Sequence, residues 1–126
     1  MSDPILVIDD DRMTRVLLKR RLGRDGFNVA FAESGRRGLE MIDERRYSLI
    51  LLDLVMPQFS GIDFLRAVRS RMDELPPIIM LSADHDTQSI KECLALGASD
   101  YLAKPIIAAA LAAKIRGALT RQSAAV

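Results

Sequence analysis

Five short apolar segments recur along the chain, at positions 5–8, 27–32, 49–52, 78–81 and 101–103. The first, third and fourth are continuously apolar, which is typical of strands covered on both faces, as in a parallel sheet. The second alternates more and fits a strand at a sheet edge, and the fifth is short and weak. These segments predict five strands.

Between the apolar segments, hydrophobic residues recur three or four positions apart, as they do along one face of a helix. The first such stripe comprises Met13, Val16, Leu17, Leu18 and Leu22. The last comprises Ile107, Leu111, Ile115 and Leu119. Strands that alternate with helices predict an α/β fold, in which right-handed crossovers join parallel strands. At 126 residues, the chain is expected to form one domain over positions 1–126.

Helix boundaries are indicated by glycine, proline and short polar residues. Gly26 and Gly97 fit helix ends, where glycine readily adopts a left-handed backbone. Ser34 and Asp86 are expected to cap helix starts. Pro76, followed by a second proline, is expected to close the third helix before the fourth strand.

Composition and charge exclude several classes of function. Lys plus Arg total 18 and Asp plus Glu total 17, so a net charge of +1 does not draw the chain to nucleic acid or membrane. Aromatic residues make up 5% and Trp is absent, which argues against base stacking. The single cysteine, Cys93, excludes an internal disulfide and is expected in the core. Without a secretory signal or an apolar run of about 20 residues, the expected location is cytoplasmic.

Polar residues follow four of the predicted strands. In open parallel sheets, functional groups gather past the carboxyl ends of the strands. Here these positions hold acids, a hydroxyl and a lysine, namely Asp9, Asp10 and Asp11 after the first strand, Asp53 after the third, Ser82 after the fourth and Lys104 after the fifth. We therefore expect these side chains to converge at one edge of the sheet.

A cluster of acids has to be neutralised. Two carboxylates about 4 Å apart repel by roughly 1 kcal/mol in water and by about 4 kcal/mol at an effective dielectric constant of 20. Raised pKa values or a bound cation relieve the repulsion, and ligands that are all oxygen favour Mg2+ or Ca2+. A lysine in the same site indicates phosphate chemistry, with the cation on one side of a phosphoryl group and Lys104 and Ser82 on the other. A carboxylate in such a site is a candidate nucleophile that forms an acyl phosphate.

Each of these residues alone also has a purely structural interpretation. The three acids suit a helix start, Asp53 suits a turn before Pro57, and Ser82 suits a cap or turn. Lys104 alone would be a surface residue, with Pro105 beginning a helix. All of these interpretations would have to hold together, in this order and at strand ends. The combination therefore favours a site for phosphoryl chemistry.

Four motifs resemble the receiver domain of response regulators, and the likeness covers nearly the whole chain. They are Ile-Leu-Val-Ile-Asp-Asp-Asp at 5–11, Leu-Asp-Leu-Val-Met-Pro at 52–57 with Gly61, Leu-Ser-Ala at 81–83, and Gly-Ala-Ser-Asp-Tyr-Leu-Ala-Lys-Pro at 97–105. The resemblance implies a flavodoxin-like (βα)5 fold in three layers, with a five-stranded parallel sheet of strand order 2-1-3-4-5. It gives Gly61 a structural role.

The resemblance also implies an acceptor and a cofactor. Asp53 is expected to take a phosphoryl group from a phosphohistidine on a histidine kinase or a histidine phosphotransfer protein. The implied cofactor is Mg2+, with Asp10 as a direct ligand and Asp9 acting partly through water. The Asp53 carboxylate and the backbone carbonyl of Val55 complete the implied ligand set.

Further residues are implied to bind the phosphoryl oxygens and to report their arrival. Ser82 and Lys104 contact the oxygens, and Tyr101 is the aromatic switch residue that turns inward once Ser82 moves. The peptide bond from Lys104 to Pro105 is expected to be cis. The fourth helix, fifth strand and fifth helix form the implied output surface, which serves a downstream protein, an output domain or a homodimer. The chain alone is expected to bind neither nucleic acid nor membrane, and to catalyse only its own phosphorylation and dephosphorylation.

Some positions depart from the family pattern or stay open. Val55 stands where many members carry a polar residue, and Asp84 lies two residues past Ser82. In the family these two positions tune autodephosphorylation, so the lifetime of the phosphoryl group stays open. Asp11 is interpreted as a helix cap, and His85 as a surface residue. The first helix is strongly basic, which fits either a solvated face or a docking surface for an acidic partner helix.

Three other functions fit parts of the sequence. A haloacid-dehalogenase-type phosphatase would use Asp9 as its nucleophile, but such enzymes are usually longer and carry a late acidic pair, whereas nothing after Lys104 is acidic. A receiver-like module without phosphorylation conflicts with the intact set of site residues. A flavodoxin-like flavin carrier would need a phosphate loop rich in Ser, Thr or Gly after the first strand, and this loop is missing.

Overall fold

The structure of the chain, a computed structural model, describes residues 3–83 and 87–124. Five strands alternate with five helices, in the order β1 (Ile5–Ile8), α1 (Arg12–Arg24), β2 (Val29–Ala32), α2 (Gly35–Glu44), β3 (Leu49–Asp53), α3 (Gly61–Arg71), β4 (Ile78–Ser82), α4 (Thr87–Ala95), β5 (Asp100–Ala103) and α5 (Ala108–Ala124). All strand pairs are parallel and the order in the sheet is β2-β1-β3-β4-β5, so the predicted fold is confirmed. No helix in this described part of the chain is long and apolar enough to cross a membrane.

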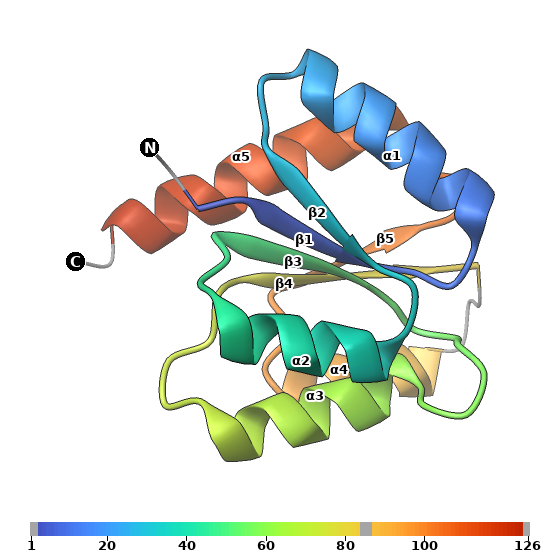
Figure 1. Ribbon diagram of the computed structural model, residues 1–126, viewed down its shortest axis with the longest axis vertical. Helices are drawn as coiled ribbons and strands as arrows, with labels where there is room; N and C mark the ends of the chain where they lie inside the picture. Colours follow the sequence, from blue (N-terminus) through green and yellow to red (C-terminus); the bar gives the residue numbers. More distant parts are fainter. Residues whose placement is uncertain (1–2, 84–86, 125–126) are drawn as a thin grey trace.

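The sheet is covered on both faces, with α1 and α5 on one side and α2, α3 and α4 on the other (Figure 1). Successive side chains of a strand point to opposite faces. In β3, Ile50 and Leu52 belong to the core under α2, α3 and α4, whereas Leu49 and Leu51 belong to the core under α1 and α5. Burying each such side chain stabilises the fold by roughly 1.5–3 kcal/mol. The continuous apolar runs of the sequence therefore reflect cover on both faces.

Most of the predicted helix boundaries are confirmed. The side chains of Asp11 and Ser34 each accept a hydrogen bond from the backbone N–H three residues further on, at the starts of α1 and α2. The backbone φ is 88° at Gly26 and 109° at Gly97, where the chain leaves α1 and α4. Asp86, the expected cap of α4, lies outside the described residues.

Two predictions about helices are wrong. The third helix does not run to the prolines, because α3 ends at Arg71 and the N–H of Met72 bonds to the Val68 carbonyl at 3.1 Å. The last stripe does not include Ile107, which precedes α5 and is 68% exposed. Pro76 instead lies in the extended segment that leads into β4.

The first apolar stripe is also only partly buried. Leu18 and Leu22 lie in the core, whereas Met13, Val16 and Leu17 are at least half exposed. At 3.6 residues per turn, Leu18 and Leu22 form one row along the helix, and Met13 and Leu17 form another row on a different side. Only the first row reaches the sheet, so α1 presents apolar side chains to solvent.

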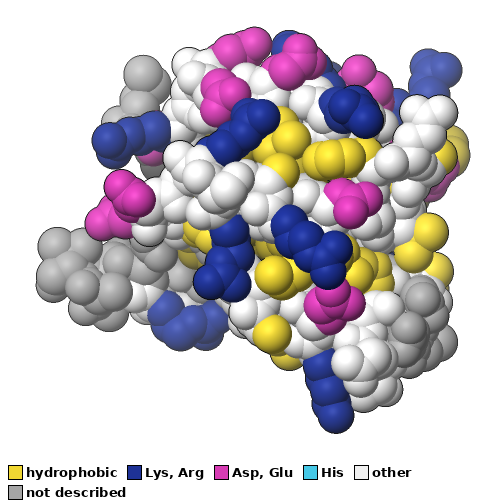
Figure 2. All heavy atoms as spheres, turned by 90° about the horizontal axis from the view of Figure 1, so that it is seen from below, with side chains coloured by type: hydrophobic (Ala, Val, Ile, Leu, Met, Phe, Trp, Pro, Cys, Tyr) yellow, Lys and Arg dark blue, Asp and Glu magenta, His cyan; other side chains and the backbone are white. Residues whose placement is uncertain are grey.

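The helices on the other face of the sheet are joined by ion pairs across their surfaces. Arg71 on α3 bonds to Asp43 on α2 at 2.8 Å, and Arg66 on α3 pairs with Glu92 on α4. Figure 2 views this side of the molecule and shows arginine or lysine side chains next to acidic ones over the helices. Opposite charges thus alternate on this face.

Candidate functional site

The carboxyl ends of the parallel strands lie at one edge of the sheet (Figure 1). The acids and the lysine of the predicted site meet at this edge. Carboxylate oxygens of Asp9, Asp10 and Asp53 all lie within 4.8 Å of one another. The Lys104 ammonium lies 2.9 Å from Asp9 Oδ2 and 3.5 Å from Asp53 Oδ2. Parallel pairing of β1 with β3, and of β4 with β3 and β5, places these strand ends side by side. We call the site formed by Asp9, Asp10, Asp53 and Lys104 the acidic pocket.

Asp9 is the anchor of the acidic pocket, because it is fully buried and bonded through every polar group. Its N–H donates to the Ala32 carbonyl at 3.1 Å, and its carboxylate accepts from the N–H of Asp11 at 2.9 Å and from Lys104. Its own carbonyl accepts from the Arg15 guanidinium at 2.8 Å. A buried charge is tolerated only when it is paired and hydrogen-bonded in this way. Asp9 is therefore a fixed negative charge beside Asp53.

Asp53 is poorly compensated by comparison. Its burial, together with the nearby charge of Asp9, raises its pKa to about 7, although Lys104 and the N–H of Val55 oppose the rise. The Val55 N–H donates to Asp53 Oδ1 at 3.3 Å, which is a long hydrogen bond. A carboxylate held near 7 is poised between its protonated and ionised forms at neutral pH. A positive charge brought to the pocket would favour the ionised form.

Lys104 carries the positive charge of the pocket. Burial disfavours its ammonium, but the hydrogen bond to Asp9 and the charge of Asp53 outweigh this effect, and the pKa of Lys104 is raised. The backbone N–H of Lys104 donates to the Ser82 carbonyl at 2.8 Å, which fixes the loop after β5 against the end of β4. The lysine is therefore charged and held in place at neutral pH.

Three residues shape the rim of the pocket, namely Ser82, Val55 and Gly61. Ser82 is fully buried at the end of β4, whereas the Val55 side chain is 62% exposed in the loop after β3. A Cβ at Gly61 would lie only 2.6 Å from the Asp53 carbonyl, so the start of α3 approaches β3 too closely for any other residue. Because the Gly61 N–H also donates to the Leu54 carbonyl at 2.9 Å, this contact fixes the loop after Asp53.

Other predicted residues can be compared with the structure where it describes them. The peptide bond from Lys104 to Pro105 is cis, as the resemblance implies. Tyr101 lies on β5, where it is partly buried against the core under α2, α3 and α4. Cys93 is buried, as expected. Asp84 and His85 lie outside the described residues.

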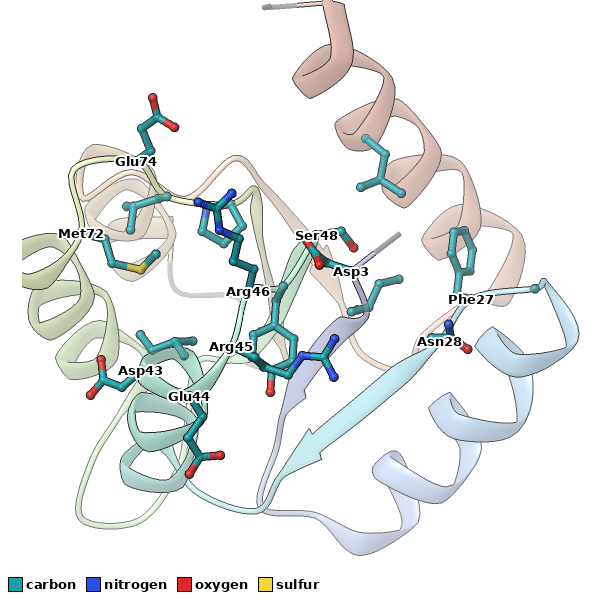
Figure 3. Close-up of a pocket in the computed structure, with 17 residues that line it drawn as sticks. Asp3, Phe27, Asn28, Asp43, Glu44, Arg45, Arg46, Ser48, Met72 and Glu74 are labelled. Atoms are coloured by element: carbon teal, nitrogen blue, oxygen red, sulfur yellow. The ribbon is translucent and has the colours of Figure 1, made fainter. Parts of the chain in front are cut away.

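A large hollow lies at the opposite edge of the sheet. It has a volume of about 880 Å3, and none of the acidic-pocket residues lines it. Its walls come from the starts of β1 and β2 and from the loop before β3, and the side chains of Arg45 and Arg46 lead away from those of Asp43 and Glu44 (Figure 3). The chemically distinctive site is therefore the acidic pocket and not this hollow.

The donor set of the acidic pocket suits a hard cation. Within residues 3–83 and 87–124 it offers three carboxylates, one of them exposed and two buried, and no nitrogen or sulfur ligand. Mg2+ prefers oxygen ligands and usually keeps several waters. The exposed Asp10 and the poorly compensated Asp53 fit such an ion, because a bound cation would relieve the repulsion among the acids.

Comparison with known proteins identifies the family. Residues 5–116 match the response regulator receiver domain. The chain belongs to this family. It is 39% identical over 121 residues to the response regulator MprA of Mycobacterium ulcerans, an alignment that covers 96% of this chain and 52% of that protein. MprA of Mycolicibacterium vanbaalenii is 38% identical over 117 residues, covering 93% of this chain and 50% of the relative. The chain thus spans about half the length of these curated relatives.

Solved structures agree with the family. A CheY-like receiver domain protein from Methanospirillum hungatei superposes with a TM-score of 0.92 at 27% identity, covering 100% of both chains. The chemotaxis protein CheY4 of Vibrio cholerae gives a TM-score of 0.87 at 28% identity, covering 94% of this chain and 99% of that one. The protein is therefore the receiver domain of a two-component response regulator, and its acidic pocket fits the phosphorylation site of such domains. The phosphatase and flavin-carrier alternatives are not supported.

One contact of this receiver domain is not among the sequence predictions. Arg15 is one of the basic residues of α1, and its guanidinium bonds to the Asp9 carbonyl. The spacing alone does not reveal it: Arg15, Leu18 and Leu22 are three and four residues apart and share one helix face, but Met13 and Leu17 form a second row with the same spacing. An arginine at the head of a buried row requires a polar partner within reach.

Proposed function

We propose that this receiver domain, formed by residues 1–126, accepts a phosphoryl group on the Asp53 carboxylate, with Mg2+ held by Asp9, Asp10, Asp53 and the Val55 carbonyl. The observation that supports the proposal is the position of Asp53, which is buried beside two other carboxylates and one lysine. In this position the pKa of Asp53 is raised to about 7. Bound Mg2+ supplies positive charge that favours the ionised Asp53 and offsets the charge of phosphoryl oxygens.

The transfer is a displacement at phosphorus. An Asp53 carboxylate oxygen attacks the phosphorus of a phosphohistidine, an O–P bond forms as the N–P bond breaks, and the imidazole leaves and takes a proton from water. Charge spreads over the equatorial oxygens as the bond order changes. Lys104 and the Ser82 hydroxyl bind these oxygens, so the chain positions groups and neutralises charge without turning over a separate substrate.

The new phosphate changes the conformation of β4, α4, β5 and α5. Ser82 is drawn toward the phosphoryl group, and Tyr101 turns further inward from its partly buried position on β5. This biases the surface formed by α4, β5 and α5 between two states, as charge-driven switches do. A downstream protein, an output domain or a second copy of the chain then binds the favoured state.

The phosphodonor docks on α1. Met13, Val16 and Leu17 expose an apolar patch there, and α1 carries basic residues and no acid. Beside the patch, a groove of about 370 Å3 runs from Leu17 to Lys104, so a docked partner lies next to the acidic pocket. This surface suits an amphipathic helix with acidic flanks, on a histidine kinase or histidine phosphotransfer protein. The absence of nucleic-acid and membrane partners, and the cytoplasmic location, stay predictions.

The acceptor is tested by incubating the chain with a small phosphodonor and Mg2+ and recording an intact mass spectrum. We expect the mass of one phosphoryl group to be added, and Asp53→Asn to abolish the addition because an amide is no nucleophile for this step. Asp43→Asn, which removes a surface carboxylate, serves as the matched control and should be phosphorylated normally. An adduct that persists in Asp53→Asn would overturn the assignment, and no adduct on the parent chain would favour a receiver-like module without phosphorylation.

A further inference from the structure

The position of Asp10 in the acidic pocket depends on the orientation of the main chain between β1 and α1. Asp10 is exposed, and it is the middle residue of the short link between the end of β1 and the Asp11 cap of α1. The Asp9 carbonyl and the Asp10 N–H belong to one rigid peptide plane. Any group that fixes the Asp9 carbonyl therefore fixes the plane from which the Asp10 side chain departs.

Arg15 is the group that holds this plane. Its guanidinium donates to the Asp9 carbonyl at 2.8 Å, and its own N–H donates to the Asp11 carbonyl at 3.1 Å. Side chains on a helix lean toward its amino terminus, which directs Arg15 back over the first turn to the end of β1. Both ends of the link are thus bonded to one residue.

The position of Arg15 is unusual for a basic residue of α1. It shares the sheet-facing row with the buried Leu18 and Leu22, whereas Arg12, Lys19 and Arg20 are exposed. Ordering a long side chain over a buried row costs conformational entropy. The hydrogen bond to the Asp9 carbonyl is the interaction that offsets this cost.

We propose that Arg15 is a positioning residue of the acidic pocket, which orients the link that carries Asp9 and Asp10 and so sets the affinity for Mg2+. Groups that orient metal ligands from outside the ligand set typically change metal affinity by about 10- to 100-fold when they are removed. This inference rests on the proposed function for its metal, and it adds a residue to which the proposed ligand set assigns no role.

The test compares Arg15→Ala with Arg12→Ala, which removes the same charge from the same helix but has an exposed side chain. Mg2+ affinity is measured by calorimetry, and the free energy of unfolding is measured alongside it. We expect Arg15→Ala to weaken Mg2+ binding about tenfold and Arg12→Ala to change it by less than about twofold. An equal change in both variants, or none in Arg15→Ala, would overturn the role.

A second measurement needs no metal. The N–H of Asp11 donates to Asp9 Oδ1, so its hydrogen exchange in the metal-free protein reports the order of the link. Exchange should be faster in Arg15→Ala and unchanged in Arg12→Ala, and equal rates in the two variants would contradict the proposal. If Arg15→Ala does not fold, Arg15→Lys carries the same test, because it keeps the stem and charge but loses the forked donor. Should the parent chain bind no Mg2+, the proposed function fails while amide exchange still decides the role of Arg15.

Discussion

Two ion pairs in this protein each join an aspartate to a lysine, but the two aspartates differ in chemistry. Asp53 faces Lys104 at 3.5 Å in the acidic pocket, and Asp100 at the start of β5 binds Lys114 of α5 at 3.0 Å. Burial and the charge of Asp9 raise the pKa of Asp53 to about 7. Burial also acts on Asp100, but the Tyr101 N–H and Lys114 outweigh it and lower the pKa.

The difference lies in how well each carboxylate is satisfied. Both oxygens of Asp100 accept from Lys114 at 3.0 Å, and the charges of Lys114 and Arg121 help to lower its pKa. The Asp53 side chain is 7% exposed against 35% for Asp100, and Lys104 is bonded to Asp9 rather than held for Asp53 alone. A well-compensated pair stabilises structure, whereas the less well-compensated Asp53 carboxylate keeps the capacity to gain a cation or a phosphoryl group.

Removing each lysine should give the largest contrast. Lys104→Ala should slow phosphorylation by a small phosphodonor by about 100-fold or more at saturating Mg2+, because it removes a charged donor from the phosphoryl oxygens. Lys114→Ala should leave the rate within about twofold, since its partner lies outside the pocket. The rate is followed by mass spectrometry, with circular dichroism to show that both variants are folded. A rate for Lys104→Ala close to that of the parent chain would contradict the assigned role.

Removing the acceptor charge should change stability in a pH-dependent way. The pKa of Asp53 is about 7 in the folded chain, against a model-peptide value of 3.8, so the folded state binds the proton more tightly between these values. In metal-free buffer, stability therefore falls as pH rises from about 4 to about 7. With roughly 1.4 kcal/mol for each pKa unit, Asp53→Asn should be more stable than the parent chain at pH 8 by about 2–4 kcal/mol.

This gain is measured by urea unfolding, and it should shrink as the pH is lowered toward 4. Added Mg2+ should reduce it as well, because the ion stabilises the parent chain by binding its folded state. Asp43→Asn, at the surface, should show no comparable gain. Lower stability of Asp53→Asn at pH 8 without metal would mean that Asp53 is already well compensated, like Asp100.

The fold of this receiver domain could be predicted because its strands report burial directly. Segments 5–8, 49–52 and 78–81 are apolar at every position, and this pattern has few explanations besides a strand covered on both faces. The chemistry could be predicted because parallel strands bring their carboxyl ends to one edge. Asp53 and Lys104 are 51 residues apart in sequence, yet the strand order alone brings them together.

Other features required the tertiary structure. The apolar residues of α1 form two rows, and nothing in the spacing tells which row meets the sheet, so Met13 and Leu17 were assigned to the same stripe as Leu18. The contact of Arg15 with the Asp9 carbonyl could not be predicted, because every residue has a backbone carbonyl and the sequence does not show which one accepts a side-chain hydrogen bond. The contrast between Asp53 and Asp100 is of the same kind, since each is an aspartate near a strand end.

The smallest expected effect concerns the satisfied pair. Asp100→Asn should lower the free energy of unfolding at pH 7 by only about 0.5 kcal/mol, because partly exposed ion pairs contribute little. Because the pKa of Asp100 is lowered in the folded chain, its contribution is present above the unfolded value of 3.8 and is lost as pH falls through the folded value. The difference between Asp100→Asn and the parent chain should therefore shrink as the pH falls below 3.8, and salt should weaken it at pH 7. A larger loss at pH 7, coupled to slower phosphorylation, would show that the pair on β5 and α5 belongs to the switch and is not merely structural.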